Sequence, residues 1–432
     1  MAPTEMEMRH RSKVQEDPPG LTTLTLDDDL PEDRKLIGID GKWYDVTDFI
    51  PKHPGGPIIE QFIGKDASVP FKSIWDHGQV LKYRKPVGTY KMGKRHPADE
   101  DFEKLIQMFH ERGWFKTDWE WYARKTLFAA ALITAAVICV VAFEQWYVHY
   151  LGAVLLTLGW QQCGFVMHDA MHKQIFRNNR WNDRKMGLAY GSFILGFSAH
   201  WWHDEHIFHH VMCNTVDHEN KFADPQMWES IWAQNEKLFP LFKGYLQYFF
   251  IKIQHITFIP FVVWLGRLEI VTDSSKQERR WYEIVALSLH WVYMCYLLSF
   301  LPTWWEVGVF YFIVNTVEGF FHFQLILSHY CKMFFDISEF HSNSWYVVQV
   351  LTNVNIDVTT RWDWIWGGLN YHIEHHLFPL LGRRHLREAG AYVQEICKKH
   401  NIDYDMCTFP EAMFKTLRHL KKAGSHYKLE FR

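Results

Sequence analysis

The pattern H-x-x-H-H occurs twice in this chain and constrains its fold and chemistry more than any other feature. The two copies are His206, His209 and His210, and His372, His375 and His376. Positions i, i+3 and i+4 share one face of a helix, so each copy predicts three imidazoles that point toward one place. Around the second copy, Asn370 is expected to cap the helix and Pro379 to end it, which leaves about two turns.

A third histidine cluster raises the number of candidate ligands to eight. His168 and His172 are spaced i, i+4 and also share a helix face. Imidazole binds iron, zinc and copper, and one ion takes four to about six ligands. Eight ligands exceed the capacity of one ion, so the count predicts two. The alternative, chance proximity among 26 histidines, explains three regularly spaced clusters less well, because histidine is seldom buried without a role.

The composition favours a membrane setting. Aromatic residues make up 17% of the chain and include 21 Trp, which suits a boundary between water and lipid. The formal net charge of -3 is nearly balanced, so we expect no nucleic acid or other polyanion as a partner. The 7 cysteines form no C-x-x-C pair, which favours a reduced compartment. Without an apolar signal segment near its start, the chain is expected to begin in the cytosol.

Changes in composition along the chain predict four regions. Residues 1–30 are polar and acidic without periodicity, so a disordered tail is expected. Residues 31–97 are expected to form a compact soluble domain. Residues 98–126 mix charged and aromatic side chains, which predicts an amphipathic linker that lies on the membrane. Residues 127–432 are expected to form a membrane domain.

Two histidines in the soluble domain are candidates for haem ligands. Residues 41–56 read G-K-W-Y-D-V-T-D-F-I-P-K-H-P-G-G, then G-K-D-A follows at 64–67, and His77 comes later. The turn after His53 fixes a loop, and apolar side chains between the two histidines can line a pocket: Ile58, Ile59, Phe62 and Phe71. This segment resembles cytochrome b5. The resemblance implies that His53 and His77 are the axial ligands of heme b, which carries electrons and leaves no position for O2.

The apolar segments predict four membrane crossings in two hairpins. Residues 127–143 and 148–167 form the first, and residues 284–301 and 307–328 the second. Both connections lack Lys and Arg, which is typical of the lumenal side. Residues 246–265 are long enough to cross, but a fifth crossing would separate the third histidine cluster from the first two. We therefore expect residues 246–265 to be interfacial, with every histidine cluster and both termini in the cytosol.

The last crossing carries a polar stripe. Asn315, Glu318, His322 and His329 lie within about 60° of one another on a helix. Polar groups in lipid normally face the bundle interior. His329, at the cytosolic end, is a ninth candidate ligand. The rest of the stripe predicts the inner end of a substrate tunnel, although hydrogen bonds between helices explain Asn315 and Glu318 equally well.

Basic residues follow the third histidine cluster. They predict a cytosolic cap that contacts lipid phosphates or a coenzyme A headgroup, or else a solvated helix face. These residues are Arg383, Arg384, Arg387, Lys398, Lys399, Lys421 and Lys422.

Three histidine clusters on one side of two helical hairpins resemble the membrane fatty-acid desaturases. With its cytochrome b5-like domain, the chain resembles the front-end desaturases and, more closely, the insect cytochrome b5-related proteins. The resemblance implies an α+β cytochrome b5-like domain, followed by an all-α membrane domain with four transmembrane helices and a cytosolic helical cap. It implies two iron ions as a di-iron centre that uses O2 to desaturate a fatty acyl-CoA or acyl lipid. The implied ligands are His168, His172, His206, His209, His210, His329, His372, His375 and His376.

The resemblance also implies an endoplasmic reticulum membrane location and NADH-cytochrome b5 reductase as the electron donor. One residue departs from the front-end pattern, because His372 stands where those enzymes usually carry glutamine. We therefore treat His372 as a ligand and infer no double-bond position from the front-end resemblance. Removing hydrogen from a methylene needs a redox-active metal, which favours iron over zinc. Two alternatives stay open, a di-iron lipid hydroxylase and a membrane-bound electron carrier without desaturase activity.

Overall fold

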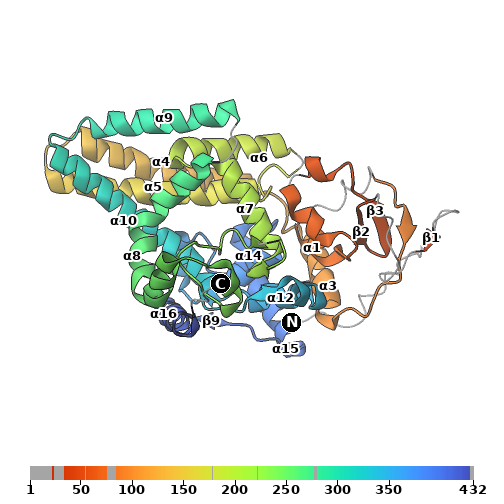
Figure 1. The fold of residues 1–432 in the computed structure, drawn as a ribbon. Helices are drawn as coiled ribbons and strands as arrows, with labels where there is room; N and C mark the ends of the chain where they lie inside the picture. The colour runs from red at the N-terminus through yellow and green to blue at the C-terminus, as the bar shows by residue number, and fades with distance from the viewer. Residues whose placement is uncertain are drawn as a thin grey trace. The chain divides into compact units, whose positions relative to one another are not determined.

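The computed structural model describes residues 22–23, 34–53, 55–74, 84–177, 179–220, 222–276 and 280–428. The chain divides into two compact units (Figure 1). The first comprises Met1–Ser68 and Asp76–Lys94, and the second comprises Val69–Trp75 and Arg95–Arg432. The expected tail lies outside the described residues, except for the strand β1 (Thr22–Thr23). His77 lies outside them as well.

A small sheet forms the first unit. Its strand order is β1-β4-β3-β2, with β2 (Leu36–Ile39), β3 (Lys42–Asp45) and β4 (Gly88–Thr89). Asp40 and Gly41 join β2 to β3, and both have positive φ, as a tight two-residue hairpin requires. Buried side chains form its core: Leu36, Trp43 and Tyr90. Two 3-10 helices lie on either side of His53, η2 (Ile50–Lys52) and η3 (Gly56–Phe62).

The second unit is mostly helical. Its longer helices are α3 (Pro97–Glu111), α4 (Trp119–Val141), α5 (Trp146–Met171), α7 (Ala199–Val211), α8 (Tyr245–Lys276), α9 (Trp281–Leu298), α10 (Trp304–Tyr330), α15 (Leu386–Lys399) and α16 (Phe409–His426). The shorter ones are α1 (Ser68–Ile74), α6 (Arg180–Gly187), the π-helix η5 (Leu188–Leu195), η6 (Glu236–Leu241), α11 (Ile337–Ser342), α12 (Trp345–Leu351), η7 (Thr360–Trp362), α13 (Asp363–Trp366), α14 (His372–Leu377) and η8 (Arg383–His385). Short strands pair as β6-β5-β7 and β8-β9: β5 (Thr215–Asp217), β6 (Phe222–Ala223), β7 (Phe335–Asp336), β8 (Asn355–Ile356) and β9 (Met406–Cys407).

Among the described residues, three helices are long and apolar enough to cross a membrane: α4, α8 and α10. The sequence predicted four, with residues 246–265 at the interface, yet these residues belong to α8. Two expected crossings lie in α5 and α9, which carry polar side chains among apolar ones. Gln162 on α5 and Glu283 and His290 on α9 are buried against neighbouring helices. Such side chains lower the mean hydropathy of a helix without exposing polar groups to lipid.

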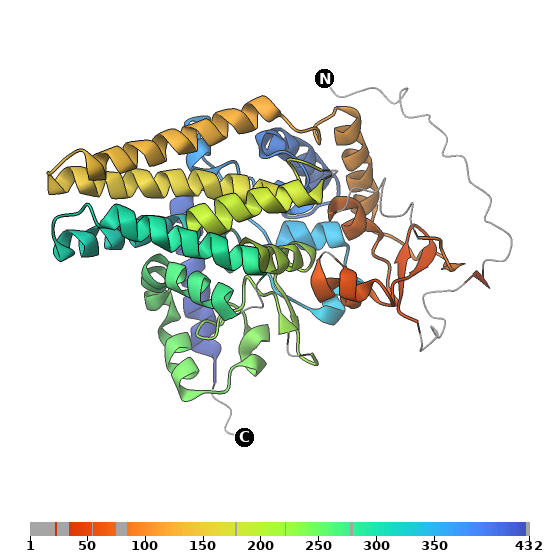
Figure 2. The same cartoon turned by 90° about the horizontal axis from the view of Figure 1, so that it is seen from above.

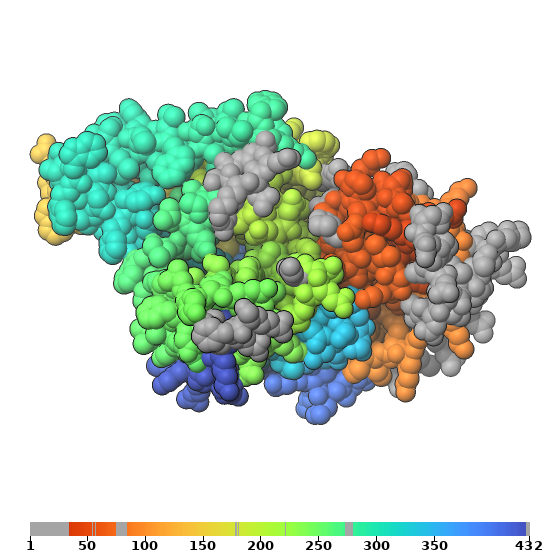
Figure 3. Space-filling model, viewed as in Figure 1, coloured from red at the N-terminus to blue at the C-terminus, as the bar shows by residue number. Residues whose placement is uncertain are grey.

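The long helices pack closely around small residues. α4 and α5 lie side by side (Figures 1 and 2), and a Cβ at Gly159 would come within 2.6 Å of Ile133. α10 packs on both α5 and α8. α9 lies on the outer surface of the unit (Figure 3) and exposes large apolar side chains there, among them Trp281 and Val292.

The helix expected to lie on the membrane after residue 97 is α3, and its apolar face is covered by protein. Phe102 and Phe109 are fully buried and pack on Phe378, just after α14. α3 also contacts α12 and α15. The segment is amphipathic as predicted, but it buries its apolar side against the histidine-bearing part of the chain and not in lipid.

Gly319 sets how closely α10 approaches α8. A Cβ at Gly319 would overlap the carbonyl oxygen of Val263. We expect Gly319→Ala to push the two helices apart and cost about 1–3 kcal/mol by overpacking. The measurement is the Tm of the purified chain in detergent. Gly308→Ala on the same helix is the control, because a Cβ there meets nothing within 4 Å. Equal Tm values for the two variants would contradict this close packing.

Candidate metal centre

All nine predicted ligand histidines meet in one buried cluster. They come from the end of α5, from α7, from the end of α10 and from α14. None is more than 8% exposed. Segments as far apart in the chain as His168 and His375 approach closely, with 3.0 Å between their Nε2 atoms.

The donor atoms fall into two groups. Among the described residues, one group is His168, His172, His206 and His375, and the other is His209, Cys213, His329 and His376. Within each group the candidate ligand atoms lie within 4.8 Å of one another. The two remaining histidines adjoin these groups. The Nε2 of His210 is 3.1 Å from that of His206, and the Nε2 of His372 is 2.8 Å from that of His329.

Each H-x-x-H-H copy spans both groups. The sequence had suggested that the three imidazoles of a copy point to a single place, and this was wrong. His206 belongs to the first group and His209 to the second, and His375 and His376 divide in the same way. The reason is the rotation between positions on a helix, which separates i from i+3, as in His206 and His209, by about 60°, and adjacent positions, as in His375 and His376, by about 100°. That rotation suits a pair of metal ions lying side by side.

The outer nitrogens of most of these histidines are hydrogen-bonded. The Nδ1 atoms of His206 and His209 lie 2.7 Å from Gln226 Oε1 and Asp224 Oδ2. Four further Nδ1 atoms have acceptors, in the pairs His168 with Asp169, His329 with the Thr352 carbonyl, His372 with the Leu369 carbonyl, and His376 with Gln349. A ring that donates from Nδ1 keeps its lone pair on Nε2, which is the form that binds a metal.

The inner nitrogens fit a metal and not a hydrogen-bond network. Facing lone pairs, such as those of His329 and His372, repel and cannot bond each other without a cation between them. His172 Nε2 and His376 Nε2 are buried with no hydrogen-bond partner within the described part of the chain. Apart from Cys213, every donor in the two groups is an imidazole, and imidazole suits iron among other transition metals. The cluster therefore fits the di-iron centre expected from the sequence.

Burial keeps most of these histidines neutral. Removal from water, reinforced by repulsion from neighbouring imidazoles, holds the pKa of His206, His210, His375 and His376 well below the usual value. The same causes lower the pKa of His372 to about 3. A neutral imidazole offers its lone pair without first losing a proton.

Glu374, not a helix cap, anchors the short helix α14. Asn370 was expected to cap it, but α14 begins at His372 and no side chain caps it. Glu374 accepts hydrogen bonds from Asn355 Nδ2 at 2.7 Å and from the Tyr404 hydroxyl at 2.9 Å. Burial raises the pKa of Glu374 to about 7. These bonds fix the orientation of the third histidine cluster.

Sequence reasoning missed the acceptors that orient the ligands. Asp169 directly follows His168, and Asp224 and Gln226 belong to a D-P-Q segment soon after the second cluster, so a local signal existed for these three. Gln349, on α12, had no such signal.

The basic cap differs from the expected lipid-binding surface, because four of its residues pair with the chain's own carboxylates. The pairs are Arg383 with Asp169, Arg384 with Asp118, Arg387 with Asp363 and Lys399 with Asp101.

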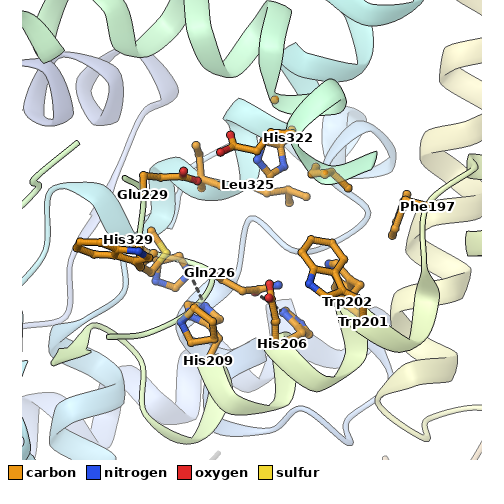
Figure 4. Close-up of a pocket in the computed structure, with 18 of the residues that line it drawn as sticks. Phe197, Trp201, Trp202, His206, His209, Gln226, Glu229, His322, Leu325 and His329 are labelled. Atoms are coloured by element: carbon orange, nitrogen blue, oxygen red, sulfur yellow. Dashed lines mark hydrogen bonds between the residues drawn. The ribbon is translucent and has the colours of Figure 1, made fainter. Parts of the chain in front are cut away.

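A cavity of about 1010 Å³ adjoins the cluster. Five of the candidate ligands line it: His168, His206, His209, His329 and His372. Figure 4 shows His206 and His209 on one side and His322 across from them. Much of the remaining wall is apolar, including Trp160, Phe197 and Leu325. Of the predicted polar stripe, Glu318 and His322 line this cavity and Asn315 does not.

In the first unit, His53 has the geometry of a metal ligand. Its Nδ1 lies 2.9 Å from the carbonyl oxygen of Gly56, so Nε2 keeps its lone pair. Apolar side chains close to it in sequence are buried: Ile58, Ile59 and Phe62. This arrangement fits an axial haem ligand. The second predicted ligand, His77, lies outside the described residues, so the pair stays a prediction.

Comparison with known families agrees with this geometry. Residues 144–408 match the family described as fatty acid desaturase, and residues 25–109 match the cytochrome b5-like heme/steroid binding domain. The chain is thus a membrane-type oxidoreductase with a haem domain, and it belongs to the fatty acid desaturase family.

Similar proteins include the Delta(8)-fatty-acid desaturase 2 of Arabidopsis thaliana, which is 32% identical over 90% of this chain and 89% of its own length. The Delta(6)-fatty-acid desaturase fat-3 of Caenorhabditis elegans is 30% identical over 90% of this chain and 96% of its own length. The acyl-lipid (9-3)-desaturase of Borago officinalis is 28% identical over 90% of both chains.

The carboxylate of Asp224 is expected to support iron binding through His209. It lies 2.7 Å from His209 Nδ1 and also accepts from the Asn214 amide. Removing such a partner typically weakens metal binding by about 10–100-fold. We expect Asp224→Ala to lower the iron content of the purified chain. Asp204→Ala is the control, because Asp204 pairs in the same way with His203, which belongs to neither group. Equal iron in both variants would contradict the role of Asp224.

Proposed function

We propose that this chain carries out O2-dependent desaturation of a fatty acyl chain at a histidine-bound di-iron centre, with electrons from the haem of its own cytochrome b5-like domain. The observation that supports this most is that five histidines of a two-group cluster form part of the wall of one large, mostly apolar cavity. Bound di-iron supplies the oxidant that removes hydrogen from an unactivated methylene. No observation favours the hydroxylase or the electron carrier.

The residues of the chain have four roles in this proposal. Nine histidines hold the two iron ions: His168, His172, His206, His209, His210, His329, His372, His375 and His376. Their hydrogen-bond acceptors fix the rings, and the apolar wall excludes water and holds the acyl chain. His53 and His77 are the axial ligands of heme b. Fusion of the haem domain to the desaturase raises its effective concentration at the iron site.

We extend the proposal to the surroundings of the enzyme. The domains are residues 31–97 and 127–432, joined by an amphipathic linker at 98–126. The substrate is an acyl-CoA or an acyl lipid, and NADH-cytochrome b5 reductase re-reduces the haem. The chain lies in the endoplasmic reticulum membrane, with both termini and the histidine cluster in the cytosol.

Four crossings, by α4, α5, α9 and α10, fit this orientation best. α8 differs from them, because Figure 1 shows it running across the direction of α4 and α5, and its Gln254 donates to carbonyl oxygens of Ala233 and Leu420. Leu420 lies on α16, an amphipathic helix with a polar outer side. We therefore propose that α8 lies at the interface, although its length and composition would also allow it to cross.

The loops at residues 142–145 and 299–303 are therefore expected to be lumenal. An N-glycosylation acceptor inserted into either loop should be glycosylated in microsomes, because only lumenal acceptors are modified. An acceptor inserted between α8 and α9 should stay unmodified. A gel shift that disappears after glycosidase treatment is the measurement. Glycosylation between α8 and α9 would contradict the four-crossing arrangement.

The test of function is lipid product analysis by mass spectrometry, after expression with a cytochrome b5 reductase and a panel of fatty acids. We expect a new double bond with the natural sequence. His375→Ala should lower product at least about 100-fold through loss of metal and leave the haem spectrum unchanged. His53→Ala should lose the haem and keep the iron. A hydroxylated product, or loss of iron in both variants, would contradict the proposal.

A further inference from the structure

The cavity has a polar wall that removal of hydrogen at the iron site does not require. It consists of Arg267 on α8 and of Glu318 and His322 on α10, all of which line the cavity. The Arg267 guanidinium pairs with the Glu318 carboxylate and donates to the carbonyl oxygen of Leu195 at 2.9 Å. It also lies 4.8 Å from the centre of the Trp160 ring. Arg267 is thus held on three sides.

The other two groups of this wall remain open to a ligand. The Glu318 side chain is 21% exposed, against 6% for Arg267. Of its two carboxylate oxygens, only Oε2 has a recorded hydrogen bond within the described residues. Neither ring nitrogen of His322 has a hydrogen-bond partner among the described residues. A chain of methylenes offers these groups nothing, and a polar group that stays unpaired in a cavity costs free energy.

The chemistry of the wall defines what can bind to it. A carboxylate only accepts hydrogen bonds, so its partner must carry an N–H or an O–H. An ester or thioester linkage has neither. We propose, on the basis of the proposed function, that Glu318 and His322 bind a hydrogen-bond donor of the acyl substrate, an amide N–H or a hydroxyl, and thereby position the methylene that reacts.

The position of the wall on α10 fixes its distance from the metal cluster. His322 and Glu318 precede His329 by seven and eleven residues, which is about 10 and 16 Å along the helix. An extended chain advances roughly 1.2 Å per bond, as three backbone bonds span at most 3.6 Å. The donor therefore lies roughly 8–13 bonds from the methylene beside the metal cluster. Because the polar wall and His329 lie on the same helix, the distance between them is rigid.

A purely structural role for the same residues predicts something different. The Arg267 and Glu318 pair ties α8 to α10, and Arg267 also binds the last residue of the π-helix η5. If the pair only joins helices, its removal lowers stability and the rates with all substrates alike. If it binds the substrate, its removal changes the preference between substrates.

The experiment compares substrates of one acyl length in membranes containing the full chain with haem and iron. The probes are a secondary N-acyl amide, its N-methyl amide, the matching ester, and a hydroxylated ester. We expect the natural sequence to convert the amide or the hydroxylated ester at least about tenfold better than the probe that lacks the donor, or about 1.4 kcal/mol. A preference for the amide over its N-methyl amide identifies an N–H as the bound donor, and a preference for the hydroxylated ester over the matching ester identifies a hydroxyl.

The variants remove the wall without leaving a buried charge. Arg267→Met is combined with Glu318→Leu, because removing one partner alone leaves the other charge unpaired. His322→Phe is made separately and keeps the proposal testable if the double variant does not fold. We expect both to lose the preference, mainly through KM for the donor-bearing probe. Asn315→Ala, on the same helix but away from the cavity, is the control and should keep it.

Absence of any preference in the natural sequence, or full preference in both wall variants, would overturn the inference and leave the desaturase intact. Absence of product from every probe, with haem and iron fully loaded, would overturn the proposed function as well.

Discussion

Nine imidazoles buried with their ring nitrogens facing one another are the constraint on which the rest of this structure depends. Without a cation, such a cluster loses hydration and gains mutual repulsion, so its folding is unfavourable unless other contacts hold it. Those contacts are the outer acceptors, above all Asp169, Asp224 and Gln349, and the close packing of α5, α7, α10 and α14. Bound metal would convert the repulsion into ligation, so the fold and the metal site stabilise each other.

The same constraint explains why so many charged residues are bound internally. Asp169 accepts from His168 and is also 2.5 Å from the Arg383 guanidinium. Arg383 in turn donates to the Gly367 carbonyl. A carboxylate that orients a ligand histidine must itself be buried, and a buried carboxylate needs hydrogen-bond donors or a cation beside it. Of the basic residues after the third histidine cluster, Arg383 therefore supports the metal centre. Arg384, Arg387 and Lys399 pair with other carboxylates, which leaves fewer basic residues to meet lipid phosphates.

The sequence predicted which histidines come together better than it predicted their arrangement. Ligand spacing is a local property, so all nine histidines could be named, including His329 from its place at the end of an apolar helix. The division into two groups depends on how α7 and α14 rotate against each other, which no local pattern records. Gln349 was missed for the same reason, since it reaches His376 from a helix with no histidine of its own. α5 and α9 were expected from length and flanking charge, although buried polar side chains such as Gln162, Glu283 and His290 interrupt their apolar stretches.

The polar wall and the metal cluster share α10, and this bears on how the position of the reaction is fixed. An apolar cavity binds methylenes almost equally at any register, because sliding by one carbon exchanges one dispersion contact for another. A chain held only in this way would react at several positions. A directional bond at a fixed distance from the metal removes that freedom, since one slip breaks a hydrogen bond to a charged group. Glu318, kept in place by Arg267, provides such a fixed point about three turns of helix from His329, counted at 3.6 residues per turn.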